Sequence, residues 1–124
     1  MKIGIRSLTL LMTLAVAATS LPELAFAESY GAIAYSRRTG ALGWSYDHPS
    51  RRSAERAAMG NCGRGDCKVL WFRDACGAVA AGPDGWGSGW GTNRRRAERE
   101  AINSCSQYSY DCEVIRWQCS GARP

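Results

Sequence analysis

The chain has 124 residues, a formal net charge of +5 and six cysteines, but only one histidine. This length suits one small domain. The single His48 and the lack of a Cys-x-x-Cys pair argue against a zinc site. We also recognise no catalytic motif, and we expect neither a metal nor a cofactor.

Residues 1–27 have the features of an export signal peptide. Lys2 and Arg6 precede an apolar run over 8–18, and the small-residue site Ala25-Phe26-Ala27 follows. The run is short for a bilayer span, and no cysteine follows the site to accept a lipid, so a retained anchor is the less favoured alternative. Processing removes two of 16 basic and one of 11 acidic residues, which leaves a charge of +4. We expect the mature chain, 28–124, in the periplasm or outside the cell.

All the cysteines lie in this mature part, and they are Cys62, Cys67, Cys76, Cys105, Cys112 and Cys119. An even number of cysteines after a signal peptide indicates disulfides formed in an oxidising compartment. A small domain profits from such cross-links because it buries only a modest fraction of its surface.

The mature chain contains one unit twice. Three segments return in order: Gly31-Ala32-Ile33-Ala34 as Gly77-Ala78-Val79-Ala80, Gly43-Trp44 as Gly89-Trp90, and Ser53-Ala54-Glu55-Arg56 as Arg96-Ala97-Glu98-Arg99. The predicted repeats are residues 30–75 and 76–120.

Each repeat has the pattern of strand, turn, strand, helix and strand. The expected strands are 32–35, 42–46 and 68–73 in the first repeat, and 78–81, 86–91 and 113–118 in the second. Helices are expected over about 50–62 and 93–105, with Ser50 and either Thr92 or Asn93 as N-caps. The predicted fold class is α+β, with two pseudo-symmetric ββαβ repeats, antiparallel strands, two helices and disulfide cross-links.

Small residues form one face of each helix and of each second strand. The helix stripes have a spacing of four: Ala54, Ala58 and Cys62, then Ala97, Ala101 and Cys105. Such stripes pack closely only on an equally small surface, so we expect them on the glycine and alanine faces of 41–45 and 87–91. Trp44 and Trp90 would then be core residues, and Trp86 would be the tryptophan most free to contact a partner. The bulky residues of each last strand would fill the core between the repeats.

Repeat symmetry also suggests a disulfide pairing, although other pairings stay open. Cys62 with Cys67, and Cys105 with Cys112, would each join a helix end to the following strand. Cys76 and Cys119 would then tie the two repeats together.

Several ordered motifs resemble one bacterial family of exported proteins. They are Tyr30-Gly31-Ala32-Ile33-Ala34-Tyr35-Ser36, Gly43-Trp44-Ser45, the Ala-Glu-Arg helices that end in cysteine, and Cys76-Gly77-Ala78-Val79-Ala80. They look like the family named domain of unknown function 4189, over essentially the whole mature chain. The resemblance implies a small secreted or envelope domain, and it implies no activity and no catalytic residues.

The residues themselves give little support to catalysis. Ser88 lacks the glycines two positions away that a serine-hydrolase elbow needs, and His48 precedes a proline where a helix is expected to begin. The glycine run 85–91 has neither the lysine of a Walker loop nor dinucleotide-binding spacing. Paired carboxylates could still converge, but Glu55 and Glu98 alternate with arginines, which favours solvated ion pairs.

Two surfaces are candidates for binding. The first turns of both helices are basic, through Arg51, Arg52, Arg94, Arg95 and Arg96. Cations there oppose the helix dipole, so the turns suit an anionic ligand, although a solvated, solubilising face is the alternative. The loop between the last helix and strand carries Tyr108 and Tyr110, a composition typical of binding loops, although a plain surface loop is the alternative.

We therefore predict an exported, non-enzymatic binding module that recognises a protein partner, as an inhibitor, an immunity-like protein or a secreted effector. Its expected contacts are the arginine turns, Trp86 and the loop with Tyr108 and Tyr110. The alternatives are an enzyme that acts on a cell-wall polymer and a domain that binds an anionic polymer.

Overall fold

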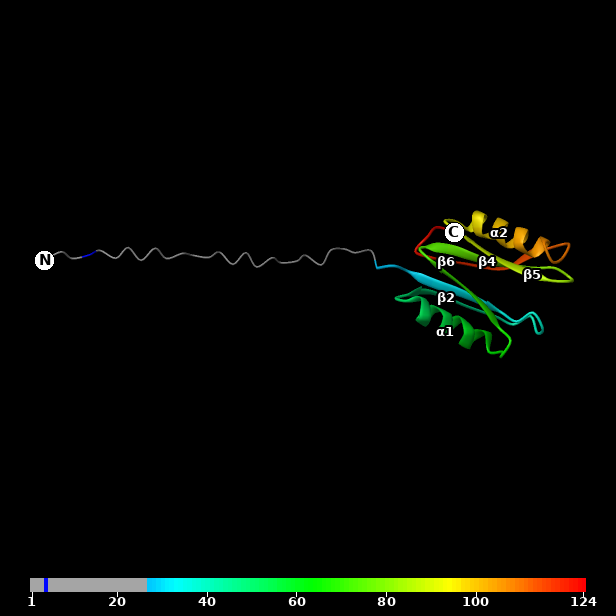
Figure 1. The fold of residues 1–124 in the computed structure, drawn as a ribbon, viewed down its shortest axis with the longest axis horizontal. Helices are drawn as coiled ribbons and strands as arrows, with labels where there is room; N and C mark the ends of the chain where they lie inside the picture. The colour runs from blue at the N-terminus through cyan, green and yellow to red at the C-terminus, as the bar shows by residue number, and fades with distance from the viewer. Residues whose placement is uncertain (1–3, 5–26) are drawn as a thin grey trace.

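The computed structural model describes residue 4 and residues 27–124 (Figure 1). Nearly all of the predicted signal peptide therefore lies outside the described residues. The elements, in chain order, are β1 (Tyr30–Tyr35), β2 (Leu42–His48), α1 (Arg51–Cys62), β3 (Lys68–Arg73), β4 (Ala75–Ala81), β5 (Trp86–Gly91), α2 (Arg94–Ser106) and β6 (Glu113–Ser120). This is the predicted order of elements, with bounds within a few residues of those expected. Among the described residues, no helix is long and apolar enough to cross a membrane.

The strands divide into two antiparallel sheets of three, with the orders β2-β1-β3 and β5-β4-β6. Each sheet is one repeat, and the first strand of the repeat lies in its centre. The two sheets stack on one another, with α1 on one outer side and α2 on the other (Figure 1). The α+β class and the two ββαβ units are thus confirmed.

Each helix begins at a polar cap and lies on a glycine-rich strand. The Ser50 side chain accepts a hydrogen bond from the Ser53 N–H, and Asn93, rather than Thr92, caps α2 in the same way. A Cβ on Gly43 would overlap the backbone of α1, and one on Gly87 would overlap the backbone of α2. The close approach of helix and strand that the small faces predicted is confirmed, because only glycine leaves room for it.

A third apolar cluster lies between the sheets and corrects the prediction for the tryptophans. Trp86 packs against this cluster, with its ring edge-on to Tyr35 at a centroid distance of 5.5 Å. Trp44 and Trp90 are instead exposed, to 38% and 60%. The prediction that these two are core residues, and that Trp86 is the most available tryptophan, is therefore wrong.

The strand register gives the physical reason. Gly43 pairs with Ala34, and Gly87 pairs with the equivalent Ala80, so Gly43 corresponds to Gly87 and not to Gly89. The turn between the strands spans 36–41 in the first repeat but only 82–85 in the second, which is two residues shorter. A shift of two keeps the glycines on the same face, because side chains alternate along a strand. It places Ser88, however, and not Trp90, at the position that Trp44 has in the first repeat.

The last strands fill the core between the repeats only in part. Leu70 and Phe72 pack in the cluster between the sheets, whereas Val69 and Trp71 are 36% and 37% exposed. Trp117 packs against the cluster under α2 instead. Alternation along each strand sends every second bulky side chain away from the inter-sheet core.

The disulfides join Cys62 to Cys67, Cys105 to Cys112, and Cys76 to Cys119. These are the pairs that repeat symmetry suggested. The third bridge does not tie the repeats together, however, because Cys76 and Cys119 are paired residues on the neighbouring strands β4 and β6, which both belong to the second repeat. The repeats are joined by their apolar core and by Ser120 of β6, whose side-chain oxygen accepts a hydrogen bond from the Asp47 N–H of β2 at 2.9 Å.

Candidate binding groove

A groove of about 690 Å³ opens on the side of the sandwich where β3 is the outermost strand. Residues 69–73 of β3 line it, together with Arg51 and Glu55 of α1 and Trp90 of β5. We call this the β3 groove. Its walls come from both repeats, because the inter-sheet packing brings β5 beside β3.

Trp71 and Arg51 form the wall of the groove nearest to α1. The Arg51 guanidinium carbon lies 4.6 Å from the centroid of the Trp71 ring, and Arg51 Nε donates to Glu55 Oε1 at 2.7 Å. The ion pair between Arg51 and Glu55 agrees with the solvated pairing expected for the helix carboxylates. The positive charge of Arg51 in the first turn of α1 opposes the helix dipole. The contacts of Arg51 with the Trp71 ring and the Glu55 carboxylate compensate for this unfavourable interaction.

Arg73 lies at the end of β3. The Tyr30 side chain and the nearby Glu28 carboxylate raise the pKa of Arg73 above its ordinary value, and the Tyr30 hydroxyl donates to Glu28 Oε2 at 2.8 Å. Its Nη1 lies 3.4 Å from Glu28 Oε1, in an exposed ion pair that water screens strongly. The groove therefore has two charged guanidinium groups beside two exposed indole rings.

The opposite side of the sandwich has the same parts around a smaller hollow. Arg94 lies 4.1 Å from the Trp117 ring centroid and pairs with Glu98, as Arg51 does with Trp71 and Glu55. The hollow beside them measures about 380 Å³. Here Arg116 of β6 lies 3.6 Å from the centroid of the Trp44 ring of β2, so a stacked pair spans the two sheets.

Arg116 is unusual in its surroundings. Its Nε is buried without a hydrogen-bond partner among the described residues, and burial lowers the pKa of Arg116. The register places Leu70 at the equivalent position in the first repeat, since Leu70 pairs with Ile33 and Arg116 with the equivalent Val79. Leu70 thus lines the β3 groove where the other side has Arg116. Ser88 of β5, the equivalent of Trp44, does not line this groove, and both differences accompany the larger hollow.

The structure separates the predicted arginine turns. Arg51 lines the β3 groove and Arg94 lines the smaller hollow on the other side. Arg96 lines a third hollow, of about 510 Å³, which runs along 88–92 and shares Trp90 with the β3 groove. Arg52 and Arg95 are exposed and line none of these three hollows.

The tyrosine loop lies apart from the groove lining. Tyr108 and Tyr110 are 67% and 60% exposed, and neither lines the β3 groove. The loop is tied to the turn between β4 and β5, because the Asp84 N–H donates to Ser109 Oγ at 2.9 Å. Its exposed rings stay candidates for a separate contact.

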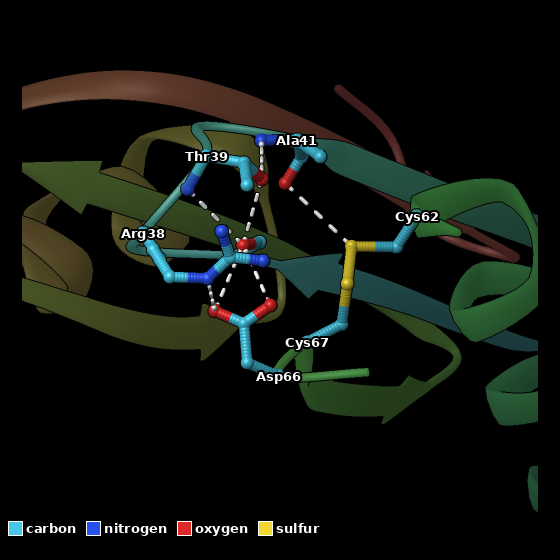
Figure 2. A network of polar contacts seen from close by, with 7 residues as sticks. Arg38, Thr39, Ala41, Cys62, Asp66 and Cys67 are labelled. Carbon is cyan, nitrogen blue, oxygen red and sulfur yellow. Dashed lines mark hydrogen bonds and ion pairs between the residues drawn. A yellow bond between two sulfur atoms is a disulfide. The ribbon is translucent and has the colours of Figure 1, made fainter. Parts of the chain in front are cut away.

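Polar clusters elsewhere have structural explanations. The single hydroxyl hydrogen of the buried Ser36 is shared between the two carboxylate oxygens of Asp66, at Oγ–O distances of 2.9 and 3.0 Å, beside Thr39, Arg38 and the Cys62–Cys67 bridge (Figure 2). This network fastens the first hairpin turn to the disulfide loop. His48 Nδ1 lies 3.1 Å from Ser53 Oγ in the first turn of α1. In residues 27–124, no group of three histidine, cysteine or acidic side chains is placed to hold a metal.

Sequence reasoning missed Trp71, Trp90 and Arg73 as groove residues. The alternation of β3, which puts Val69, Trp71 and Arg73 on one face, was the available signal for two of them. The exposure of Trp90 depends on the register of β5 and had no comparable signal.

Comparison with known proteins places these features in a family. The family model "Domain of unknown function (DUF4189)" matches residues 30–119. Protein Rv1269c of Mycobacterium tuberculosis is 40% identical over 94 residues, which cover 76% of this chain and 72% of that protein. Uncharacterized protein Rv1813c of the same organism is 35% identical over 91 residues, covering 73% of this chain and 60% of that one.

A solved structure supports the fold as well as the family. The NMR structure of Rv1813c from Mycobacterium tuberculosis aligns with a TM-score of 0.60 and 36% sequence identity, over 73% of this chain and 74% of that one. Since the family model spans most of the described residues, the chain belongs to the DUF4189 family.

Proposed function

We propose that this chain is an exported, non-enzymatic binding module whose β3 groove recognises a protein partner with acidic and apolar side chains. The observation that carries the proposal is the exposure of Trp71 and Trp90, 37% and 60%, in a groove of about 690 Å³ beside two charged arginines. Tryptophan and arginine are the residues most enriched among those that dominate protein interfaces.

The groove is also pre-organised for binding. Arg51 is held by Glu55 and by the Trp71 ring, so it loses little side-chain freedom when a ligand arrives. The indole rings offer contact area with few rotatable bonds. Such a surface binds more tightly than an equal area of flexible side chains.

Export is the second part of the proposal. Three disulfides support it, because they persist in oxidising compartments, and the pattern of residues 1–27 supports it from the sequence. We expect the protein recovered from the envelope or the medium to begin at Glu28 and to contain no free thiol. A chain of unprocessed mass with reactive thiols would refute export.

The groove is tested by capture from envelope and culture-supernatant proteins of the source bacterium. Trp71→Ala combined with Trp90→Ala should reduce capture of the partner by at least about 30-fold, the usual effect of losing an interface hot spot. Trp44→Ala is the matched control, because Trp44 is exposed to 38% on the other side of the sandwich.

Three outcomes would contradict the proposal. Equal capture by all variants would place the contact elsewhere. Capture of polysaccharide or another anionic polymer, lost at high salt and insensitive to both tryptophans, would support the anionic-polymer alternative. Turnover of peptidoglycan by the wild-type protein would favour the enzyme alternative.

A further inference from the structure

We propose that the occupant of the β3 groove is an extended peptide segment that pairs with β3 as an additional strand, an inference that rests on the proposed function. β3 pairs with β1 along all of Lys68–Arg73 without a register shift. It is the last strand in its sheet, so its outer edge has no strand partner in the described part of the chain. Such an edge offers backbone N–H and C=O groups to an incoming strand.

The groove follows this edge. Its lining includes five consecutive residues, 69–73. Successive side chains of a strand point to opposite faces, so a hollow that meets all five must run along the edge between the faces. Arg51 stands over one face and Trp90 over the other, which leaves a slot of the kind that an extended chain fills.

The other sheet edges are less suitable. β6 and β2 each pair across a register shift, and such bulges disturb the regular edge that a new strand needs. β5 pairs regularly, but its edge hollow is lined by glycines and polar residues, with Trp90 as its aromatic residue. The β3 edge combines regular pairing with apolar anchors.

The two walls predict the side chains of the peptide. A strand added to β3 places alternate side chains on the Arg51 and Trp71 face and on the Phe72 and Trp90 face. The first face favours carboxylates because its lining has two guanidinium groups, Arg51 and Arg73, against one carboxylate, Glu55, and the second favours apolar groups. The expected ligand therefore alternates acidic and apolar residues.

A second copy of the chain is a poorer fit. Two β3 strands paired antiparallel in full register would set Lys68 opposite Arg73 twice, and like charges directly opposite are destabilising. The same basic ends of the strand attract an acidic segment. Charge thus selects a different chain as the occupant.

The test is a display library of random peptides, long enough to span β3, selected on the disulfide-intact mature protein and counter-selected on the Trp71→Ala, Trp90→Ala variant. We expect enrichment of sequences that alternate acidic and apolar residues. A selected peptide is then synthesised with single N-methyl groups along its backbone. Methylation at every second residue should raise the Kd at least about tenfold, while the intervening positions should change it by less than about threefold.

Each other result overturns the inference. No enrichment, enrichment without a period of two, or an equal response to all N-methyl positions would exclude strand pairing. A peptide-displaced dimer in sedimentation velocity would assign the edge to a second copy. The partner-capture experiment is independent of this one. If the tryptophan variant loses capture but the peptides show no strand pairing, the proposed binding groove is still supported and only the strand-pairing inference is refuted.

Discussion

Gly89→Ala tests the contact between β5 and α2, on which the second repeat is built. A Cβ at this position would lie 2.5 Å from Glu100 Cβ and 2.6 Å from the Glu100 carbonyl carbon, and the Ala101 backbone nitrogen would also be too close. Ordinary contacts begin near 3.4 Å, so α2 would have to move away by close to 1 Å. The helix carries Ala97, Ala101 and Cys105 into the core, and it cannot move without opening that cluster.

We expect the cost at the upper end of the overpacking range, about 3 kcal/mol, because most of the obstructing atoms belong to the backbone. For a domain of this size, 1 kcal/mol shifts Tm by about 4–8 °C, so the Tm should fall by about 12–24 °C. The assay is thermal unfolding of the disulfide-intact mature protein, followed by circular dichroism.

Gly60→Ala is the matched control, because it makes the same chemical change where nothing lies within 4 Å of the new Cβ. Gly60 is within α1, so alanine should raise the free energy of unfolding by up to about 1 kcal/mol. The two variants should therefore move Tm in opposite directions. A Gly89→Ala protein that melts within about 2 °C of wild type would refute the close-packed interface.

The remaining predictions concern two polar side chains and the disulfide with the greatest sequence separation. Ser36→Ala should lower the free energy of unfolding by about 1–2 kcal/mol, since Asp66 loses the bifurcated hydrogen bond from the Ser36 hydroxyl and the Thr39 hydroxyl loses its acceptor, and urea titration measures this. Arg116→Leu should leave the Tm unchanged or raise it, because it removes a buried, unpartnered Nε and leucine already fills the equivalent position in the first repeat; a drop of more than about 5 °C would contradict this. Replacing Cys76 and Cys119 by alanine should cost about 4 kcal/mol in urea unfolding, against about 2 for either short bridge, because its sequence separation is 43 residues. Equal losses for all three bridges would argue against the loop-entropy reasoning.

Much of the fold could be predicted because the same local sequence patterns occur in both repeats. Ser50 and Asn93 are capping residues before alanine stripes, and each stripe meets a glycine face on the preceding strand. Helix capping and hydrophobic periodicity depend on residues that are close in sequence, so they can be recognised from the sequence alone. The disulfide pairs follow from the same repetition.

The candidate site was less predictable. Arg51 was identified by its place in the first turn of a helix, but its partner Trp71 comes from a strand 20 residues later. The sequence match of Trp90 with Trp44 predicts a core residue, but Trp90 is 60% exposed. Whether a tryptophan is buried depends on which strand lies opposite it, and that is a property of the stacked sheets.

The sequence by itself determined the two ββαβ units, the Ser50 cap, the small packing faces and the candidate disulfide pairs, since each rests on spacing within one repeat. Only the tertiary structure decided how the repeats meet. A turn shorter by two residues slides β5 along β4, which puts Trp86 in the core and Trp90 in the open. The stacking of the sheets then brings Trp90 beside β3 and creates the groove. Contacts between distant segments follow from register and layer packing, which short-range patterns do not specify.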